Sequence, residues 1–200
     1  MGACAKAFPV RQSATVGSNS KVYRSKLCRL IVIGALISVG GNARAQGLQL
    51  ESSGVRFGFS PESPNHRFHQ VDVTANWNLP WDWELGSRWH LQSRMDVSVG
   101  WLGDPGGDAA IGTFGPSLVL SLRGFPIVLE GGVSPTLLSR HEFATKNLGS
   151  YFQFTSHAGL DWDFSSHFRL TYRFQHMSNA DIDSPNPGLN LHMVGLSYFF

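Results

Sequence analysis

The sequence predicts an all-β fold: an eight-stranded antiparallel transmembrane β-barrel of the outer membrane. Three observations predict it. Apolar and polar side chains alternate along eight segments, the connections between these segments tend to be short and long in turn, and the last segment ends in an aromatic residue, Phe200. No apolar stretch beyond residue 45 reaches the roughly 18 residues that a transmembrane helix needs.

Residues 1–45 have the composition of a secretory signal peptide. A basic segment precedes the apolar run at 30–40, and Ala43, Arg44 and Ala45 form a small-x-small cleavage site. The apolar run would span about 16 Å as a helix, against about 30 Å of hydrocarbon in a bilayer. We therefore expect cleavage after Ala45 and a single barrel domain over residues 46–200.

Charge and cysteine content exclude two further classes of protein. Residues 1–45 hold seven of the sixteen Lys and Arg residues and none of the fourteen acids, so residues 46–200 carry a net charge of about −5. Nucleic acid is therefore not an expected partner. Both cysteines, Cys4 and Cys28, lie in the signal peptide, and Cys28 precedes the apolar run. We expect neither a disulfide framework nor a lipid-modified cysteine.

The strands are predicted from a period of two. Within 88–101, one face begins at Trp89 and ends at Trp101 with mostly apolar residues between them, whereas the other face carries Arg94 and Asp96. A soluble sandwich seldom needs tryptophan at both ends of one face and charges along the other, but a membrane barrel does. Similar segments are 54–60, 67–79, 87–101, 110–122, 127–134, 148–160, 167–178 and 189–200.

The predicted connections alternate in length. Those after strands two, four and six are short (80–86, 123–126 and 161–166), whereas those after strands three, five and seven carry glycine, proline and charge (103–109, 135–147 and 179–188). Short periplasmic turns and longer outer loops are typical of outer-membrane barrels. An even number of strands places both termini of the chain on the periplasmic side, so the loop at 179–188 is expected to face outward.

The final strand gives a second signal. Val194, Leu196, Tyr198 and Phe200 share one face, and this pattern resembles the signature that the barrel-assembly machinery recognises, which makes that machinery an expected partner during biogenesis. The alternative is an ordinary amphipathic edge strand. In lipid the barrel must close, because an open edge would leave backbone donors and acceptors unpaired.

The seventh predicted strand departs from the barrel pattern near its end. Between Phe168 and Phe174 the even-numbered residues are apolar and are expected to face lipid. If the alternation continues, His176 and Ser178 lie on the same lipid-facing side. Their backbones lie about 6–7 Å apart there, which lets an imidazole reach a serine hydroxyl as base and nucleophile. A hairpin makes the last strand a neighbour, so Asn190 can lie beside His176.

These residues leave two interpretations open. Polar groups that face lipid are costly and usually functional, which indicates a serine hydrolase opening onto the outer leaflet. The alternative is that His176 and Ser178 lie at the rim above the hydrocarbon, where polar residues are ordinary.

A resemblance to a known family narrows this choice. His-Met-Ser-Asn-Ala at 176–180, followed by Pro-Asn-Pro-Gly at 185–188, resembles the C-terminal motif of the lipid A 3-O-deacylase (PagL) family. The resemblance implies that Ser178 is the nucleophile and His176 the general base. It further implies that Asn186, with backbone N–H groups of the turn at 179–181, holds the oxyanion. It implies no metal and no organic cofactor.

The sequence departs from the family pattern at two positions. The residue that orients the histidine is commonly Glu in this family, whereas the count from the motif places Asn190 there. Asp181 stands where a small residue, often Gly, is expected, which puts the oxyanion turn formed by Asn179 to Asp181 in question. Asp183 is a nearby acid that could orient the histidine instead. Its odd number and its position in the loop make it a weaker candidate than Asn190 for this role.

The resemblance also implies the activity. The protein would be a serine esterase of the cell outer membrane that hydrolyses the ester-linked 3-hydroxyacyl chain at position 3 of lipid A, with lipid A or lipopolysaccharide of the outer leaflet as its partner. A homodimer is left open. One alternative is a non-catalytic barrel with a stabilising or adhesive role. Another is a lipid A palmitoyltransferase, which needs an apolar pocket inside the barrel.

The remaining charged residues and histidines are interpreted as structural. No HxH or HExxH spacing indicates a metal site. The predicted polar plug inside the barrel comprises Arg88, Arg94, Asp96, Glu130 and Arg173. The histidines interpreted as structural are His66, His69, His90, His141, His157, His167 and His192.

Overall fold

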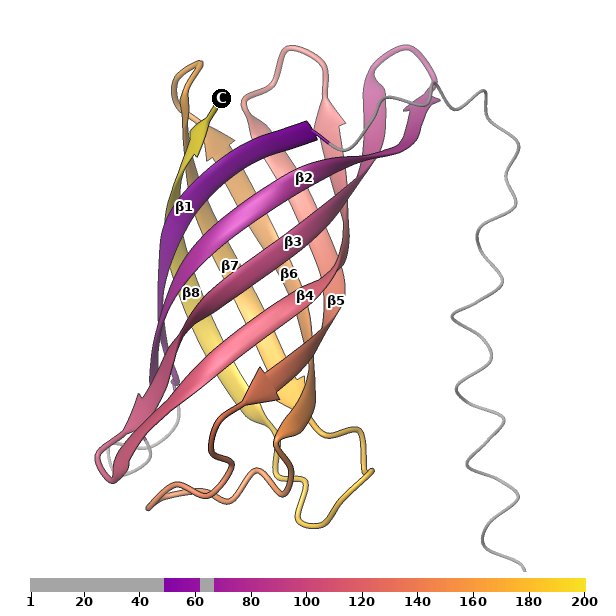
Figure 1. The fold of residues 1–200 in the computed structure, drawn as a ribbon. Helices are drawn as coiled ribbons and strands as arrows, with labels where there is room; N and C mark the ends of the chain where they lie inside the picture. The colour runs from indigo at the N-terminus through magenta and orange to yellow at the C-terminus, as the bar shows by residue number, and fades with distance from the viewer. Residues whose placement is uncertain (1–48, 62–66) are drawn as a thin grey trace, which may run out of the picture. The chain divides into compact units, whose positions relative to one another are not determined.

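The computed structural model describes residues 49–61 and 67–200, and every structural statement below refers to them. This part of the chain forms one closed antiparallel barrel in which consecutive strands pair and β1 pairs with β8 (Figure 1). The strands are β1 (Gln49–Phe59), β2 (His69–Leu85), β3 (Trp89–Asp104), β4 (Gly107–Leu122), β5 (Ile127–Leu138), β6 (Phe152–Asp163), β7 (Phe168–Ser178) and β8 (Leu189–Phe199).

The predicted fold class and strand number are confirmed. Within the described ranges, no helix is long and apolar enough to cross a membrane. The predicted signal peptide at 1–45 lies outside the described residues. The start of β1 and the end of β8 lie at the same end of the barrel (Figure 1).

The second strand runs further than predicted. We expected a connection over 80–86, whereas β2 continues to Leu85 and the turn lies at 86–88. The register between β2 and β3 shifts between Asn78 and Asp82. Pro80 lies at this irregularity, where its missing N–H costs no bond of the ladder.

The predicted long connection over 103–109 is wrong. Strand β3 continues to Asp104 and β4 begins at Gly107, which leaves only Pro105 and Gly106 between them. The Gly106 N–H donates to the Asp104 carboxylate at 2.8 Å, and Gly107 has a φ of 143°, a conformation that favours glycine. The connections at 139–151 and 179–188 do form longer loops, at the same end as this hairpin (Figure 1).

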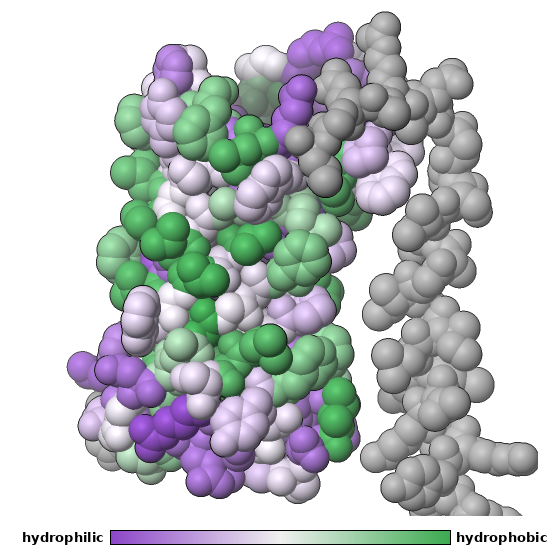
Figure 2. All heavy atoms as spheres, viewed as in Figure 1, coloured by the Kyte–Doolittle hydropathy of each residue, from purple (hydrophilic) through white to green (hydrophobic). Residues whose placement is uncertain are grey.

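The alternation of side chains predicted from the sequence is present in the structure. Along β7, buried and exposed residues alternate up to Met177, with odd-numbered side chains inside the barrel. Large apolar side chains on the outer surface remain exposed, among them Val99, Trp101 and Phe174. Figure 2 shows hydrophobic residues over the middle of the barrel and hydrophilic residues gathered towards both of its ends. This distribution is the one that a lipid-embedded barrel requires.

The predicted polar plug lies inside the barrel, with one correction. Arg94 and Arg173 each pair with both Asp96 and Glu130: Arg94 Nε lies 2.8 Å from Asp96 Oδ1, and Arg173 Nε lies 2.7 Å from Glu130 Oε1. All four residues are buried. Arg88 does not belong to the plug, because it precedes β3 in the turn and is exposed.

The end of the interior near the longer loops is apolar. Its fully buried side chains include Met177, which separates His176 from Ser178, together with Leu189 and Leu191 of β8. They belong to a cluster of buried residues that comprises Phe68, Leu102, Ala109, Ile111, Leu138, Phe143, Leu148, Met177, Leu189, Leu191 and Met193. Close packing of this kind gives the outer ends of β7 and β8 a rigid interior support.

Candidate active site

The structure places the three predicted catalytic side chains on the outside of the barrel, at the end that carries the longer loops. His176 is exposed, whereas Ser178 and Asn190 are half-buried. The intervening Met177 points inward and is fully buried. The sequence-based assignment of His176 and Ser178 to the outer face is therefore correct. Ser178 is the last residue of β7 and adjoins the loop at 179–188.

His176 and Asn190 form the central contact of the site. They are directly opposite each other in the β7–β8 ladder, and His176 Nδ1 lies 2.7 Å from Asn190 Oδ1. Because an amide oxygen only accepts hydrogen bonds, Nδ1 carries the hydrogen in this pair. The other ring nitrogen, Nε2, is then unprotonated in the neutral ring. This is the tautomer that a general base needs.

The Ser178 hydroxyl makes no hydrogen bond within the described residues. The structure thus brings the serine and the histidine to one face without a hydrogen bond between them. Such bonds often tighten only when substrate is bound. A second serine, Ser156 of β6, lies directly opposite His176 and is exposed on the same face.

Gly188 closes one side of the imidazole. Its φ of 65° lies in the left-handed region, and a Cβ at this position would lie 2.8 Å from His176 Cε1 and 3.4 Å from Nε2. Both the backbone conformation and the lack of space therefore require glycine. The last residue of the Pro-Asn-Pro-Gly motif packs against the ring of the first residue of the His-Met-Ser-Asn-Ala motif.

The turn after Ser178 is strained. Ala180 and Asp181 have φ values of 53° and 61°, which is uncommon for residues other than glycine. Aspartate tolerates this region better than most residues, which explains how Asp181 can occupy a position where glycine was expected. Strain of this kind persists only where the surroundings impose it, and it clusters at functional sites.

Asn186 bridges this turn. Its Oδ1 accepts the Asn179 N–H at 3.0 Å, and its Nδ2 donates to Asp181 Oδ1 at 3.1 Å. The Asn179 N–H is thus already used, whereas the N–H groups of Ala180 and Asp181 have no partner among the described residues. One hydrogen of the Asn186 amide also remains available. Three donors of the turn that follows Ser178 are therefore left without a partner among the described residues.

The side chain of Asn179 has a different environment from that of the other predicted site residues. It is fully buried, and its Nδ2 lies 3.0–3.3 Å from the carbonyl oxygens of Leu148, Asp183 and Pro185. Asn179 therefore ties the β7–β8 loop to the loop at 139–151 rather than facing the outer surface.

Two features of this region could not be found from sequence spacing alone. The register that sets Ser156 opposite His176 depends on the pairing of β6 with β7. His192, interpreted as structural, lies on the outer face with its Nδ1 2.6 Å from the Tyr172 hydroxyl, and its ring stacks on Phe59. The even position of His192 in the sequence predicted that it lies on the outer face, but it did not predict the contacts with Tyr172 and Phe59.

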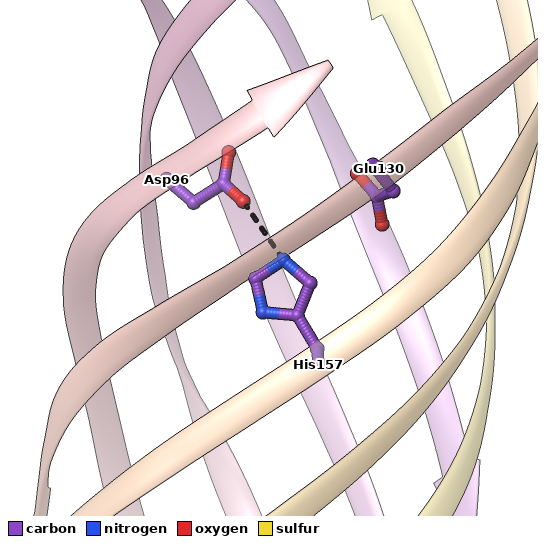
Figure 3. A group of neighbouring side chains, drawn as sticks. All are labelled: Asp96, Glu130 and His157. Carbon is purple, nitrogen blue, oxygen red and sulfur yellow. Dashed lines mark ion pairs between the residues drawn. The ribbon is translucent and has the colours of Figure 1, made fainter. Parts of the chain in front are cut away.

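Among the described residues, Asp96, Glu130 and His157 bring potential metal ligands together inside the barrel (Figure 3). Both carboxylates are already paired with Arg94 and Arg173. A cation would have to displace these arginines, whose charges oppose it at close range. We interpret the group as part of the polar plug.

Comparisons with known proteins identify a family and relatives to which this chain is similar. The family model described as lipid A 3-O-deacylase (PagL) matches residues 69–199. The lipid A deacylase PagL of Bordetella bronchiseptica is 31% identical over 146 residues, which cover 66% of this chain and 78% of the relative. The lipid A deacylase PagL of Pseudomonas aeruginosa is 28% identical over 134 residues, covering 62% of this chain and 77% of the relative.

A solved structure supports the fold. The crystal structure of the outer membrane enzyme PagL superposes with a TM-score of 0.63 at 21% identity, covering 73% of this chain and 97% of that one. The fold is that of a small outer-membrane β-barrel, and the candidate active site lies on its outer face. The chain belongs to the lipid A 3-O-deacylase (PagL) family.

Proposed function

We propose that this protein is a lipid A 3-O-deacylase that hydrolyses the ester-linked 3-hydroxyacyl chain at position 3 of lipid A by a serine and histidine mechanism. The observation that carries the proposal is the contact of His176 with Asn190 on the outer face, beside Ser178. Family membership supports the substrate. Lipid A lies in the outer leaflet, so a site that opens sideways into this leaflet meets the ester without a channel.

In the proposed reaction, His176 Nε2 takes the proton of the Ser178 hydroxyl while Oγ attacks the ester carbonyl. The tetrahedral intermediate collapses with cleavage of the bond to the sugar oxygen, which receives the proton from His176. Water then attacks the acyl-serine, with His176 again as the base, and releases the free 3-hydroxy fatty acid. Asn190 holds the imidazole in the required tautomer throughout.

The oxyanion of both intermediates would be held by the donors beside Ser178. These are the Ala180 and Asp181 N–H groups and the free hydrogen of the Asn186 amide. Fixed donors of this kind stabilise developing charge because they need no reorganisation during the reaction. Ser156 has no comparable turn next to it, which favours Ser178 as the nucleophile.

A covalent probe tests the identity of the nucleophile. A fluorophosphonate loses fluoride when an activated serine oxygen attacks its phosphorus, and mass spectrometry of peptides then locates the adduct. We expect the adduct on Ser178 in the folded protein, and slower labelling when lipid A is added. An adduct on Ser156, or equal labelling of several exposed serines, would overturn the assignment.

Asn190 is expected to matter less than the nucleophile. Asn190→Ala should lower turnover by at most about 10²-fold, because it frees the imidazole to rotate but leaves the serine, base and oxyanion donors in place. The isosteric Asn190→Asp keeps the acceptor and adds a charge that offsets the imidazolium, so its turnover should equal or exceed that of the wild type. Steady-state hydrolysis of lipid A in detergent measures both. If Asn190→Ala lost as much activity as Ser178→Ala with the barrel intact, Asn190 would be as essential as the nucleophile.

A further inference from the structure

The loop between β5 and β6 reaches the candidate active site through Lys146. Lys146 Nζ donates a hydrogen bond to the carbonyl oxygen of Gly188 at 3.0 Å, 42 residues away in sequence. Gly188 is the residue whose backbone packs against the His176 imidazole. Lys146 therefore contacts the peptide group that bounds the imidazole ring.

The position of Lys146 is itself fixed by β3. The Asp104 carboxylate accepts the N–H and the hydroxyl of the preceding residue, Thr145, at 3.0 and 2.8 Å, and its other oxygen accepts the Gly106 N–H. Asp104 is buried at the end of the β3–β4 hairpin. Charge-assisted hydrogen bonds of this kind are stronger than those between neutral groups. The segment that carries Lys146 is thus anchored to the barrel wall.

A second connection joins the same two loops on the other side of Lys146. The carbonyl oxygen of Leu148 accepts hydrogen bonds from Asn179 and from Gln153, at 3.3 and 3.1 Å. Gly149 has a φ of 81°, and a Cβ there would lie 1.9 Å from the Pro185 carbonyl oxygen. The β7–β8 loop is therefore held at its start by Asn179 and at its end by Lys146.

We propose that Lys146 is a positioning residue for the catalytic pair, which holds the Gly188 backbone against the His176 imidazole; this rests on the serine and histidine chemistry proposed above. Without this contact the end of the loop is freer to move, and the imidazole loses its boundary on one side. The alternative role for this half-buried lysine is attraction of the anionic substrate. The two roles differ in which substrates they affect.

Two substrates separate these roles. Lipid A carries phosphate, whereas p-nitrophenyl acetate is neutral and small, so only the catalytic groups act on it. If Lys146 positions the pair, Lys146→Met lowers kcat on both substrates by the same factor, between about 10- and 100-fold, with KM for lipid A little changed. Arg140→Met is the matched control. It removes the same charge from an exposed residue of the same loop. The Arg140 guanidinium contacts the Glu142 carbonyl oxygen and the Phe143 ring but, among the described residues, not Gly188, so Arg140→Met should leave both rates unchanged.

The opposite pattern would overturn the inference. A rise in KM for lipid A with the p-nitrophenyl acetate rate unchanged would make Lys146 a substrate-binding residue, and so would equal losses in Lys146→Met and Arg140→Met on lipid A alone. Heat-modifiable electrophoretic mobility checks that each barrel is folded. If Lys146→Met does not fold, Thr145→Val loosens the same segment. It should lower kcat by a smaller factor, and this factor should again be the same for both substrates. Ser178→Ala serves in the same assays: if it retained activity, the proposed function would fail, whatever the Lys146 variants do.

Discussion

Ser178→Ala is expected to reduce lipid A hydrolysis by at least about 10³-fold, because it removes the atom that forms the acyl intermediate. The oxyanion donors and the histidine remain in this variant, but they have no nucleophile to assist. Ser178 is half-buried at the end of β7, and its hydroxyl makes no hydrogen bond among the described residues, so the barrel should fold normally. Release of 3-hydroxy fatty acid from purified lipid A in detergent measures the loss.

Ser156→Ala is the matched control for this variant. Ser156 is an exposed serine on the same face, directly opposite His176 on β6, so its hydroxyl is the competing candidate within reach of the base. We expect this variant to keep nearly wild-type turnover. A large loss in Ser156→Ala with activity retained in Ser178→Ala would exchange the roles of the two serines.

Glu130→Ala is expected to destabilise the barrel more than any surface substitution, by about 3–5 kcal/mol. Glu130 is buried and pairs with both Arg94 and Arg173, so its removal leaves two buried guanidinium groups with Asp96 as their nearest shared acid. An uncompensated buried charge costs far more than the pair itself contributes. Reversible unfolding by urea in lipid vesicles measures the change in the free energy of unfolding.

Glu84→Ala gives the comparison for an exposed ion pair. Glu84 lies 3.4 Å from Arg123 near the turns at the opposite end of the barrel from the candidate site, with both side chains more than half exposed. Exposed pairs contribute at most about 1 kcal/mol. If Glu130→Ala and Glu84→Ala destabilised the barrel equally, the interior ion pairs would be as well solvated as those on the surface, and this account of the polar plug would be wrong.

The strands and their faces were predictable because a lipid-embedded strand has a period of two that tertiary context cannot override. The same count placed His176 and Ser178 on the outer face, and the hairpin between β7 and β8 brought Asn190 beside His176, as the structure has it. Local chemistry was harder to predict. Pro80 was taken as part of a connection, although a register shift lets β2 continue through it.

Loop lengths and long-range contacts were not predictable in the same way. Glycine and proline at 103–109 indicated a long loop, but the Asp104 carboxylate caps a tight hairpin there. The contact of Lys146 with Gly188 joins two loops that are adjacent only because the barrel closes. Nor did alternation show that the interior becomes apolar beneath Met177, since the inward residues there come from several different strands.

The site residues Asn179 and Asn186 were predicted as one group but do different things in the structure. The motif placed both beside Ser178, yet only the bond lengths reveal that the Asn186 amide spans the turn while the buried Asn179 amide ties two loops together. Their roles in the reaction remain proposals. Sequence spacing gives the neighbourhood of a side chain, and hydrogen-bond geometry gives its direction.

The most direct test is the mass of lipid A extracted from cells that produce either the wild-type protein or Ser178→Ala, each confirmed as a folded barrel in the outer membrane. The proposed function predicts that lipid A loses one 3-hydroxyacyl chain only in cells with the wild-type protein. Unchanged lipid A in both strains, or the same loss in both, would contradict it.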